Sequence, residues 1–202
     1  MRRSCRGPVA FLGLTGGLGA GKSTALAALE RLGAATLSTD AVVHDLYGSD
    51  EVRDAVVERW GPEMAPEGVV DRSAVAAKAF ASPEERQWLE ELLWPRVGRR
   101  VAEWREEVTA REPPPAAAVV ETPLLFEAGL EGLYDATVAV VAPEGIRAVR
   151  AAERGHAAVD ERAARQLPQE EKARRATYAV ENSGSVADLE AKLSEILSDL
   201  SR

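Results

Sequence analysis

The chain has 202 residues, 46% of them apolar and 29% charged, which is typical of a globular domain with a buried core and excludes a disordered or fibrous chain. Its formal net charge of −8 repels phosphate backbones, so nucleic acid is not an expected partner. One cysteine excludes an intrachain disulfide and a multi-cysteine metal site. Because no stretch beyond the amino-terminal region approaches the roughly 18 uncharged apolar residues of a membrane span, we expect a soluble, cytoplasmic protein with no membrane partner, a monomer or a weak homo-oligomer.

Short apolar runs alternate with helical patterns at both ends of the chain, which is typical of a parallel sheet built from βαβ units. A helix is predicted over 21–32, with Gly33 at its end. A last helix has Val186, Leu189, Leu193, Ile196 and Leu200 on one face, and Ser185 with Asp188 opens it as a capping box. The expected strands are 9–14, 34–37, 116–120 closing at Glu121, 136–141 and 177–180.

The middle of the chain has a different pattern. Residues 41–111 contain no credible strand, are rich in Glu, Arg and Ala, and carry all four tryptophans. Three successive prolines, 113–115, end this stretch, since proline can neither continue a helix nor donate to a strand ladder. We therefore expect one α/β domain with a five-stranded parallel sheet flanked by helices: a core of about 8–40, 116–142 and 176–202, a helical insertion of about 41–112, and an Arg-rich lid of about 143–175.

Residues 16–23 read GGLGAGKS and satisfy GxxxxGK[ST] between an apolar strand and an amphipathic helix. Such glycines let the backbone wrap phosphate oxygens, so that N–H groups and the helix N-terminus face the anion. Lys22 would place its charge on the β- and γ-phosphates, and the Ser23 hydroxyl would bind Mg²⁺, with Thr24 as the less favoured neighbour. The motif predicts ATP and Mg²⁺ as cofactors, held by Gly17, Leu18, Gly19, Ala20, Gly21, Lys22, Ser23 and Thr24.

This phosphate-binding loop (P-loop) indicates a nucleotide and magnesium, but not the reaction. A GTPase would need an NKxD-type signature, which the sequence lacks, and a motor would need a longer chain. The remaining hypotheses are a kinase of a small acceptor, such as a nucleoside monophosphate or a sugar acid, and a nucleotide-binding switch without an acceptor.

Two carboxylates follow predicted strands at the edge where a parallel sheet presents its ligands. Asp40 would accept the proton of an attacking hydroxyl, but it is equally compatible with an N-cap of the next helix. Glu121 is at the position from which P-loop proteins hold Mg²⁺ through a water, and the alternative is an exposed acid at a strand end.

Three further groups are candidates. Arg147, Arg150 and Arg154 share a helix face from which guanidinium groups would clamp phosphoryl oxygens, although they are also compatible with surface arginines. The residues after Thr122 would form either a wall for the acceptor or a structural turn: Pro123, Leu124, Leu125 and Phe126. Residues 182–184 indicate a turn.

Four segments match, in order, the pattern of dephospho-CoA kinases, which this chain resembles over nearly its whole length: FLGLTGGLGAGKST, STDAVVHDLY, VVETPLLFEAGL and ATYAVENSGS. Residues 71–95 are also similar to that family's helical substrate region, so the resemblance implies that the helical insertion of about 41–112 binds the acceptor. The chain departs from the family pattern at Ser38, where the usual DAD becomes STD, and at Trp94, where the family has a histidine.

The resemblance implies transfer of the ATP γ-phosphoryl group to the ribose 3′-hydroxyl of dephospho-CoA, the last step of coenzyme A biosynthesis. It favours Asp40 as a catalytic group beside Lys22, and it matches His44 to a family position, although a lone histidine is more often a packed structural residue. It selects Arg150 as a catalytic lid residue and Arg154 as an ATP ligand. Arg162 and Gln166 resemble the second half of the lid, and the turn with Asn182 and Gly184 would flank the adenine ring.

Overall fold

The computed structural model describes residues 9–153 and 166–201. The chain divides into two compact units, Met1–Ser38 with Arg105–Arg202, and Thr39–Trp104. We call the first the sheet unit and the second the helical unit. The second is one continuous segment inserted between the two parts of the first.

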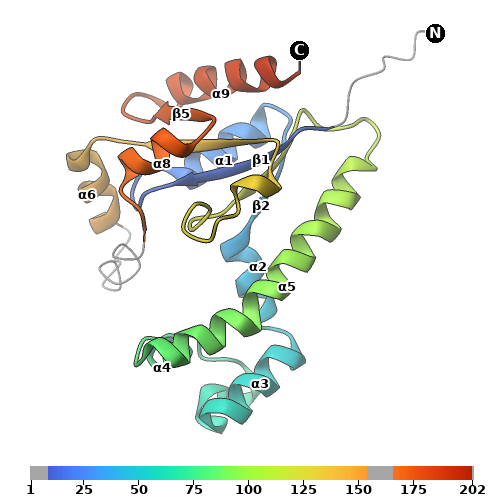
Figure 1. Cartoon of the computed structure of the whole chain (residues 1–202), viewed down its shortest axis with the longest axis vertical. Helices are drawn as coiled ribbons and strands as arrows, with labels where there is room; N and C mark the ends of the chain where they lie inside the picture. The colour runs from blue at the N-terminus through green and yellow to red at the C-terminus, as the bar shows by residue number, and fades with distance from the viewer. Residues whose placement is uncertain (1–8, 154–165, 202) are drawn as a thin grey trace. The chain divides into compact units, whose positions relative to one another are not determined.

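The strands of the sheet unit are β1 (Phe11–Gly16), β2 (Ala35–Ser38), β3 (Ala118–Glu121), β4 (Ala136–Val141) and β5 (Tyr178–Glu181) (Figure 1). Among the described residues they form one parallel five-stranded sheet in the order β2-β3-β1-β4-β5. The predicted α/β fold is therefore confirmed. Strand β4 has its predicted bounds, whereas the other strands begin one or two residues later than predicted.

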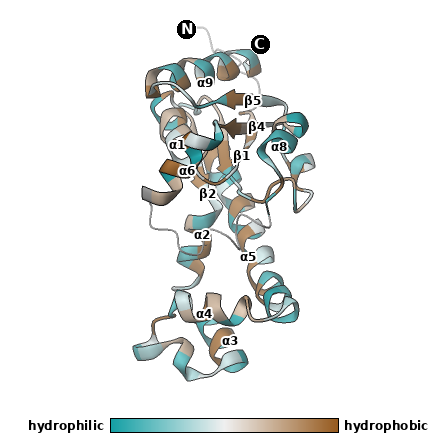
Figure 2. Ribbon diagram, turned by 90° about the vertical axis from the view of Figure 1, so that its left-hand side faces the viewer, coloured by the Kyte–Doolittle hydropathy of each residue, from teal (hydrophilic) through white to brown (hydrophobic). Residues whose placement is uncertain are grey.

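One face of the sheet is covered by α1 (Lys22–Arg31) and α9 (Val186–Leu200), which pack against each other. Alternate residues of β1, Leu12 and Leu14, face these helices in one buried apolar cluster. Figure 2 shows apolar and hydrophilic residues alternating along α9, as expected of a helix with one buried side.

The opposite face of the sheet carries the other alternate residues of β1. The ring of Phe11 stacks on Tyr134 with centroids 4.9 Å apart. A Cβ built on Gly13 would lie 2.5 Å from Cδ1 of Leu125, so only glycine leaves room for the segment after β3. This segment includes η3 (Glu131–Leu133), and α8 (Gln169–Arg175) packs against β4 and β1.

The capping box of α9 is confirmed. Ser185 Oγ accepts from the backbone N–H of Asp188, and Asp188 Oδ2 accepts from the backbone N–H of Ser185. Of the predicted face, Leu189, Leu193 and Ile196 are buried and Leu200 is half-buried, whereas Val186, the first residue of the helix, is half exposed. Leu197 is buried in addition.

The helical unit contains α2 (Thr39–Leu46), α3 (Asp50–Trp60), η1 (Pro62–Met64), η2 (Pro66–Gly68), α4 (Arg72–Ala79) and most of α5 (Pro83–Thr109). The prediction that this stretch has no strand is confirmed for the described residues 39–104. Its own buried core includes Val52, Val56 and Val75, and Trp60 contacts Trp88 edge to face.

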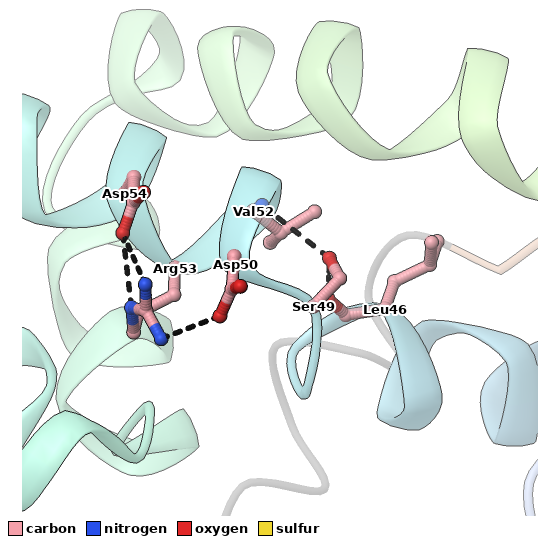
Figure 3. A network of polar contacts seen from close by, with 6 residues as sticks. All are labelled: Leu46, Ser49, Asp50, Val52, Arg53 and Asp54. Carbon is pink, nitrogen blue, oxygen red and sulfur yellow. Dashed lines mark hydrogen bonds and ion pairs between the residues drawn. The ribbon is translucent and has the colours of Figure 1, made fainter.

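Figure 3 shows why α3 begins where it does. Ser49 is its N-cap, and Oγ of Ser49 accepts from the N–H of Val52 and donates to the carbonyl of Leu46. Arg53 pairs with Asp50 and Asp54 on the exposed side of the first turns, at 2.7 Å each.

None of the helices in the described part of the chain has the length and apolar character needed to cross a membrane.

Candidate active site

The loop between β1 and α1 has the backbone that a phosphate cradle requires. Gly19 and Gly21 have φ angles of 73° and 94°, which L side chains rarely adopt. There is also no room for a side chain, because a Cβ on Gly19 would meet the backbone of Arg147 and one on Gly21 would meet the amide of Asn182. The loop ends at Lys22, where α1 begins with its N-terminal N–H groups toward the loop.

The side chain of Lys22 folds back over this loop. Its Nζ donates to the carbonyl of Gly16 at 3.1 Å and to that of Gly17 at 3.4 Å. Ser23 is exposed and Thr24 is half-buried in the first turn of α1. In this position, the ammonium group of Lys22 would contact a polyphosphate bound in the loop.

Asn182 lies at the end of β5 and is 4% exposed. Its Nδ2 donates to the carbonyl of Ala20 at 2.9 Å, and its backbone N–H donates to Val141. The Asn182 side chain therefore supports the P-loop from within, whereas the sequence predicts a role beside the adenine ring for the turn that contains it. Gly184, in the turn before α9, is exposed.

Helix α6 (Glu144–Glu153), which lies in the segment predicted to be a lid, contacts the same loop. Arg147 Nε donates to the carbonyl of Leu18 at 3.0 Å, and Arg150 Nη1 donates to the carbonyl of Asn182 at 3.2 Å. Both arginines thus contact the nucleotide-binding region, and Arg147, which the family resemblance did not select, contacts the P-loop itself. Arg154 and Arg162 lie outside the described residues, and Gln166 is half-buried.

Glu121 ends β3, the strand that pairs with β1, and its side chain is 7% exposed. Ser38 Oγ donates to Glu121 Oε2 at 2.8 Å. One carboxylate, that of Glu121, and the Ser23 hydroxyl in the first turn of α1 are a donor set that fits Mg²⁺, which keeps several waters and relies on substrate phosphates instead of a protein cage. The described residues contain no group of three or more His, Cys, Asp and Glu arranged to hold a metal.

The turn after Glu121 differs from its prediction in part. Leu125 and Phe126 have exposed fractions of 0% and 2%, because Leu125 packs over Gly13 and Phe126 packs under the guanidinium of Arg175. These two side chains belong to the core of the sheet unit, so the structural alternative holds for them. Pro123 and Leu124 are half-buried and keep surface that an acceptor can contact.

Sequence reasoning missed Lys172 on α8. Its side chain is fully buried, and Nζ lies 2.9 Å from Glu127 Oε1 and donates to the carbonyl of Pro123 at 2.6 Å. Burial lowers the pKa of Lys172, and the Glu127 carboxylate opposes this shift. No sequence signal pointed to this residue, because QEEKARR has the composition of a solvated helix face.

Two candidates belong to the helical unit. Asp40 is exposed in the first turn of α2, which already begins at Thr39, so Asp40 is not the N-cap of this helix. His44 is exposed, and its Nδ1 contacts the guanidinium of Arg72 on α4. The alternative of a packed structural histidine therefore does not hold for His44, and its assignment to the acceptor stays a prediction.

A GxxxxGK[ST] loop between the central strand and α1, a carboxylate at the adjacent strand end and arginines on α6 define a P-loop kinase. The family model of dephospho-CoA kinase matches residues 10–188. The chain belongs to the dephospho-CoA kinase family.

Two relatives carry the name of this family, and a solved structure has the same fold. The dephospho-CoA kinase of Anaeromyxobacter dehalogenans is 39% identical over 194 residues, which cover 94% of this chain and 91% of that protein. The dephospho-CoA kinase of Thermus thermophilus is 37% identical over 193 residues, with the same coverage. The crystal structure of TT1252 from Thermus thermophilus superposes with a TM-score of 0.79 at 35% identity, covering 97% of this chain and 100% of that one.

Proposed function

We propose that this protein transfers the γ-phosphoryl group of ATP to the ribose 3′-hydroxyl of dephospho-CoA, giving CoA and ADP. The observation that carries the proposal is the family match over residues 10–188, which includes the P-loop, Glu121, the lid helix and the 182–184 turn. In the reaction the acceptor oxygen bonds to the γ-phosphorus as the bond to the bridging oxygen of ADP breaks. The hydroxyl proton leaves to a carboxylate.

The P-loop binds the phosphates in this proposal. Backbone N–H groups of residues 17–24 and the N-terminus of α1 face the anion, and Lys22 neutralises charge on the β- and γ-phosphates. Bound Mg²⁺ would add charge neutralisation across those phosphates, held through the Ser23 hydroxyl and, through water, by Glu121. Because phosphoryl transfer has a loose transition state, this positioning and neutralisation matter more than any single base.

Asp40 is assigned to hold the acceptor hydroxyl and to take its proton. Its exposed carboxylate at the start of α2 leaves it accessible to a substrate. His44, Pro123 and Leu124 are assigned to the acceptor site, and Arg150, with Arg154, to the transferred phosphoryl group. The turn with Gly184 is assigned to the adenine ring, and the enzyme is expected to act in the cytoplasm as a monomer or weak homo-oligomer.

A coupled assay of ADP release tests this function. We expect ADP release from ATP and Mg²⁺ that depends on dephospho-CoA and is much slower with AMP, with a sugar acid or with no acceptor. Equal rates with and without acceptor would indicate a nucleotide switch, and a preference for AMP or the sugar acid would indicate a different small-molecule kinase.

A further inference from the structure

Lys172 on α8 and Glu127 in the segment after β3 form a buried ion pair. Lys172 has an exposed fraction of 0% and the Glu127 side chain one of 14%, and their charged atoms are 2.9 Å apart. Oε1 of Glu127 also accepts from the backbone N–H of Leu167 at 2.7 Å. Removing two charges from water is costly, and an apolar pair of similar volume often stabilises a fold as well or better. Stability alone therefore does not explain this pair.

The bonds of Lys172 indicate what the pair does. Its Nζ donates to the carbonyl of Pro123, two residues after Glu121. The same carbonyl accepts from Oγ1 of Thr15 at 3.3 Å, and Thr15 is the buried residue of β1 just before the P-loop. One carbonyl thus joins the P-loop strand, the turn after Glu121 and α8.

Helix α8 is itself fixed to the sheet. Gln169 Nε2 donates to the carbonyl of Ala142 at 2.9 Å, and Gln169 Oε1 accepts from the N–H of Ala142 at 3.2 Å. Ala142 directly follows β4, so Lys172 reaches the Pro123 carbonyl from a helix with an independent anchor. A flexible lysine on a loosely held helix would not define the position of a turn.

We propose that Lys172 is a positioning residue: its ammonium, paired with Glu127, fixes the 123–127 turn against the P-loop strand and so sets the place of the half-buried Pro123 and Leu124. The assignment of these two residues to the acceptor rests on the proposed function, whereas the ordering of the turn does not. Lys172 itself touches neither ATP nor acceptor in this proposal.

The test compares Lys172→Met with the double variant Lys172→Met/Glu127→Gln. The single variant keeps the aliphatic volume but leaves Glu127 as an unpaired buried carboxylate, so its melting temperature should fall. The double variant removes both charges, and its melting temperature should recover most of that loss. It still lacks the donor to the Pro123 carbonyl. The matched control is Lys192→Met, because Lys192 also donates to a backbone carbonyl, that of Glu181, from an exposed site on α9.

Two measurements then separate positioning from stability. Hydrogen exchange of the turn amides, such as Ala128 and Leu130, which donate to Leu124 and Leu125, should be faster in the double variant, while β1 and α9 exchange as in wild type. The KM for dephospho-CoA should rise roughly ten-fold with a smaller change in the KM for ATP, since misplaced binding groups weaken productive geometry.

Wild-type exchange in the turn of the double variant would overturn the proposal, as would a KM for dephospho-CoA that recovers together with the melting temperature. If the wild-type protein shows no transfer to dephospho-CoA, the proposed function fails. Hydrogen exchange still decides the role of Lys172 in that case, because it needs no turnover.

Discussion

Ser38 Oγ donates to Glu121 Oε2 at 2.8 Å and so joins the last residues of β2 and β3. The two residues are register partners of the parallel pair, so their side chains leave the sheet side by side. Because Glu121 is 7% exposed, the hydroxyl satisfies an oxygen that solvent scarcely reaches. The serine that departs from the family pattern therefore has a definite partner in this chain.

Ser38→Ala should weaken the response to magnesium. Without the donor, the Glu121 carboxylate is held less firmly, and a hydrogen bond to a charged group contributes about 1.5–3 kcal/mol, so we expect the Mg²⁺ concentration for half-maximal activity to rise by about ten-fold or more. The measurement is a Mg²⁺ titration of activity, paired with Mn²⁺ binding to the complex with a non-hydrolysable ATP analogue. Ser38→Thr, which keeps the hydroxyl, is the control. An Ala variant with wild-type responses in both titrations would show that the bond does not serve the metal.

Lys22→Ala should abolish phosphoryl transfer and leave the fold intact, because it removes the charge on the β- and γ-phosphates while the glycine backbone of the loop remains. Steady-state turnover and a thermal melt check both halves of this expectation. Lys78→Ala, an exposed lysine on α4, should have no effect on either. Near-normal turnover of the Lys22 variant would remove the P-loop assignment.

Asp40→Asn should lower turnover by about 10²- to 10⁴-fold, the range for a positioned general base, with little change in acceptor binding. Stability should hardly change, because Asp40 lies inside the first turn of α2 and is not its N-cap. Asp45→Asn on the exposed side of the same helix is the matched control. The measurements are turnover with saturating ATP and dephospho-CoA and thermal melts of the variants. An active, equally stable Asp40→Asn enzyme would show that Asp40 is not a catalytic residue.

Arg147→Ala and Arg150→Ala separate two lid roles. Arg147 bonds to Leu18 within the P-loop, so its loss should raise the KM for ATP. Arg150 donates to the carbonyl of Asn182, whose side chain in turn donates to Ala20 of the loop. We expect loss of Arg150 to lower kcat more than it changes either KM, because its contact with the phosphates is expected mainly in the transition state. Kinetics with each substrate varied in turn distinguish the two patterns. If Arg147→Ala lowers kcat and Arg150→Ala raises the KM for ATP, the two roles assigned to these arginines are exchanged.

Asn182→Ala should weaken ATP binding, although the Asn182 side chain itself is not expected to contact the nucleotide. The substitution removes the donor to Ala20 and opens space under the loop, so the unfolding free energy should fall by about 1–3 kcal/mol and the KM for ATP should rise. Ser183→Ala, at the exposed residue that follows Asn182, is the control. Denaturant unfolding and ATP titration are the measurements, and a stable variant with wild-type ATP affinity would refute a role in shaping the P-loop.

Local patterns were enough to predict the strands, the P-loop and the capping box of α9. Apolar runs, glycine spacing and the Ser185–Asp188 pair act over a few residues, so they specify the same local structure in many surroundings. The strand ends were less accurate, because a strand begins where a neighbour pairs with it. For β1 that point is Phe11 opposite Ala118, although Val9 and Ala10 continue the apolar run.

The fold class, the ATP-binding motif and the carboxylates at strand ends could all be inferred from the sequence, because each depends on residue types at short, fixed spacing. The three-dimensional packing was needed to show that Leu125 and Phe126 are core residues, that Asn182 supports the P-loop and that Lys172, in a run of charged residues, is buried against Glu127. Such burial and pairing arise between segments that are distant in the chain. The hydrogen bonds from Lys172 to Pro123 and from Asn182 to Ala20 join residues 49 and 162 positions apart, and no local pattern specifies contacts over such separations.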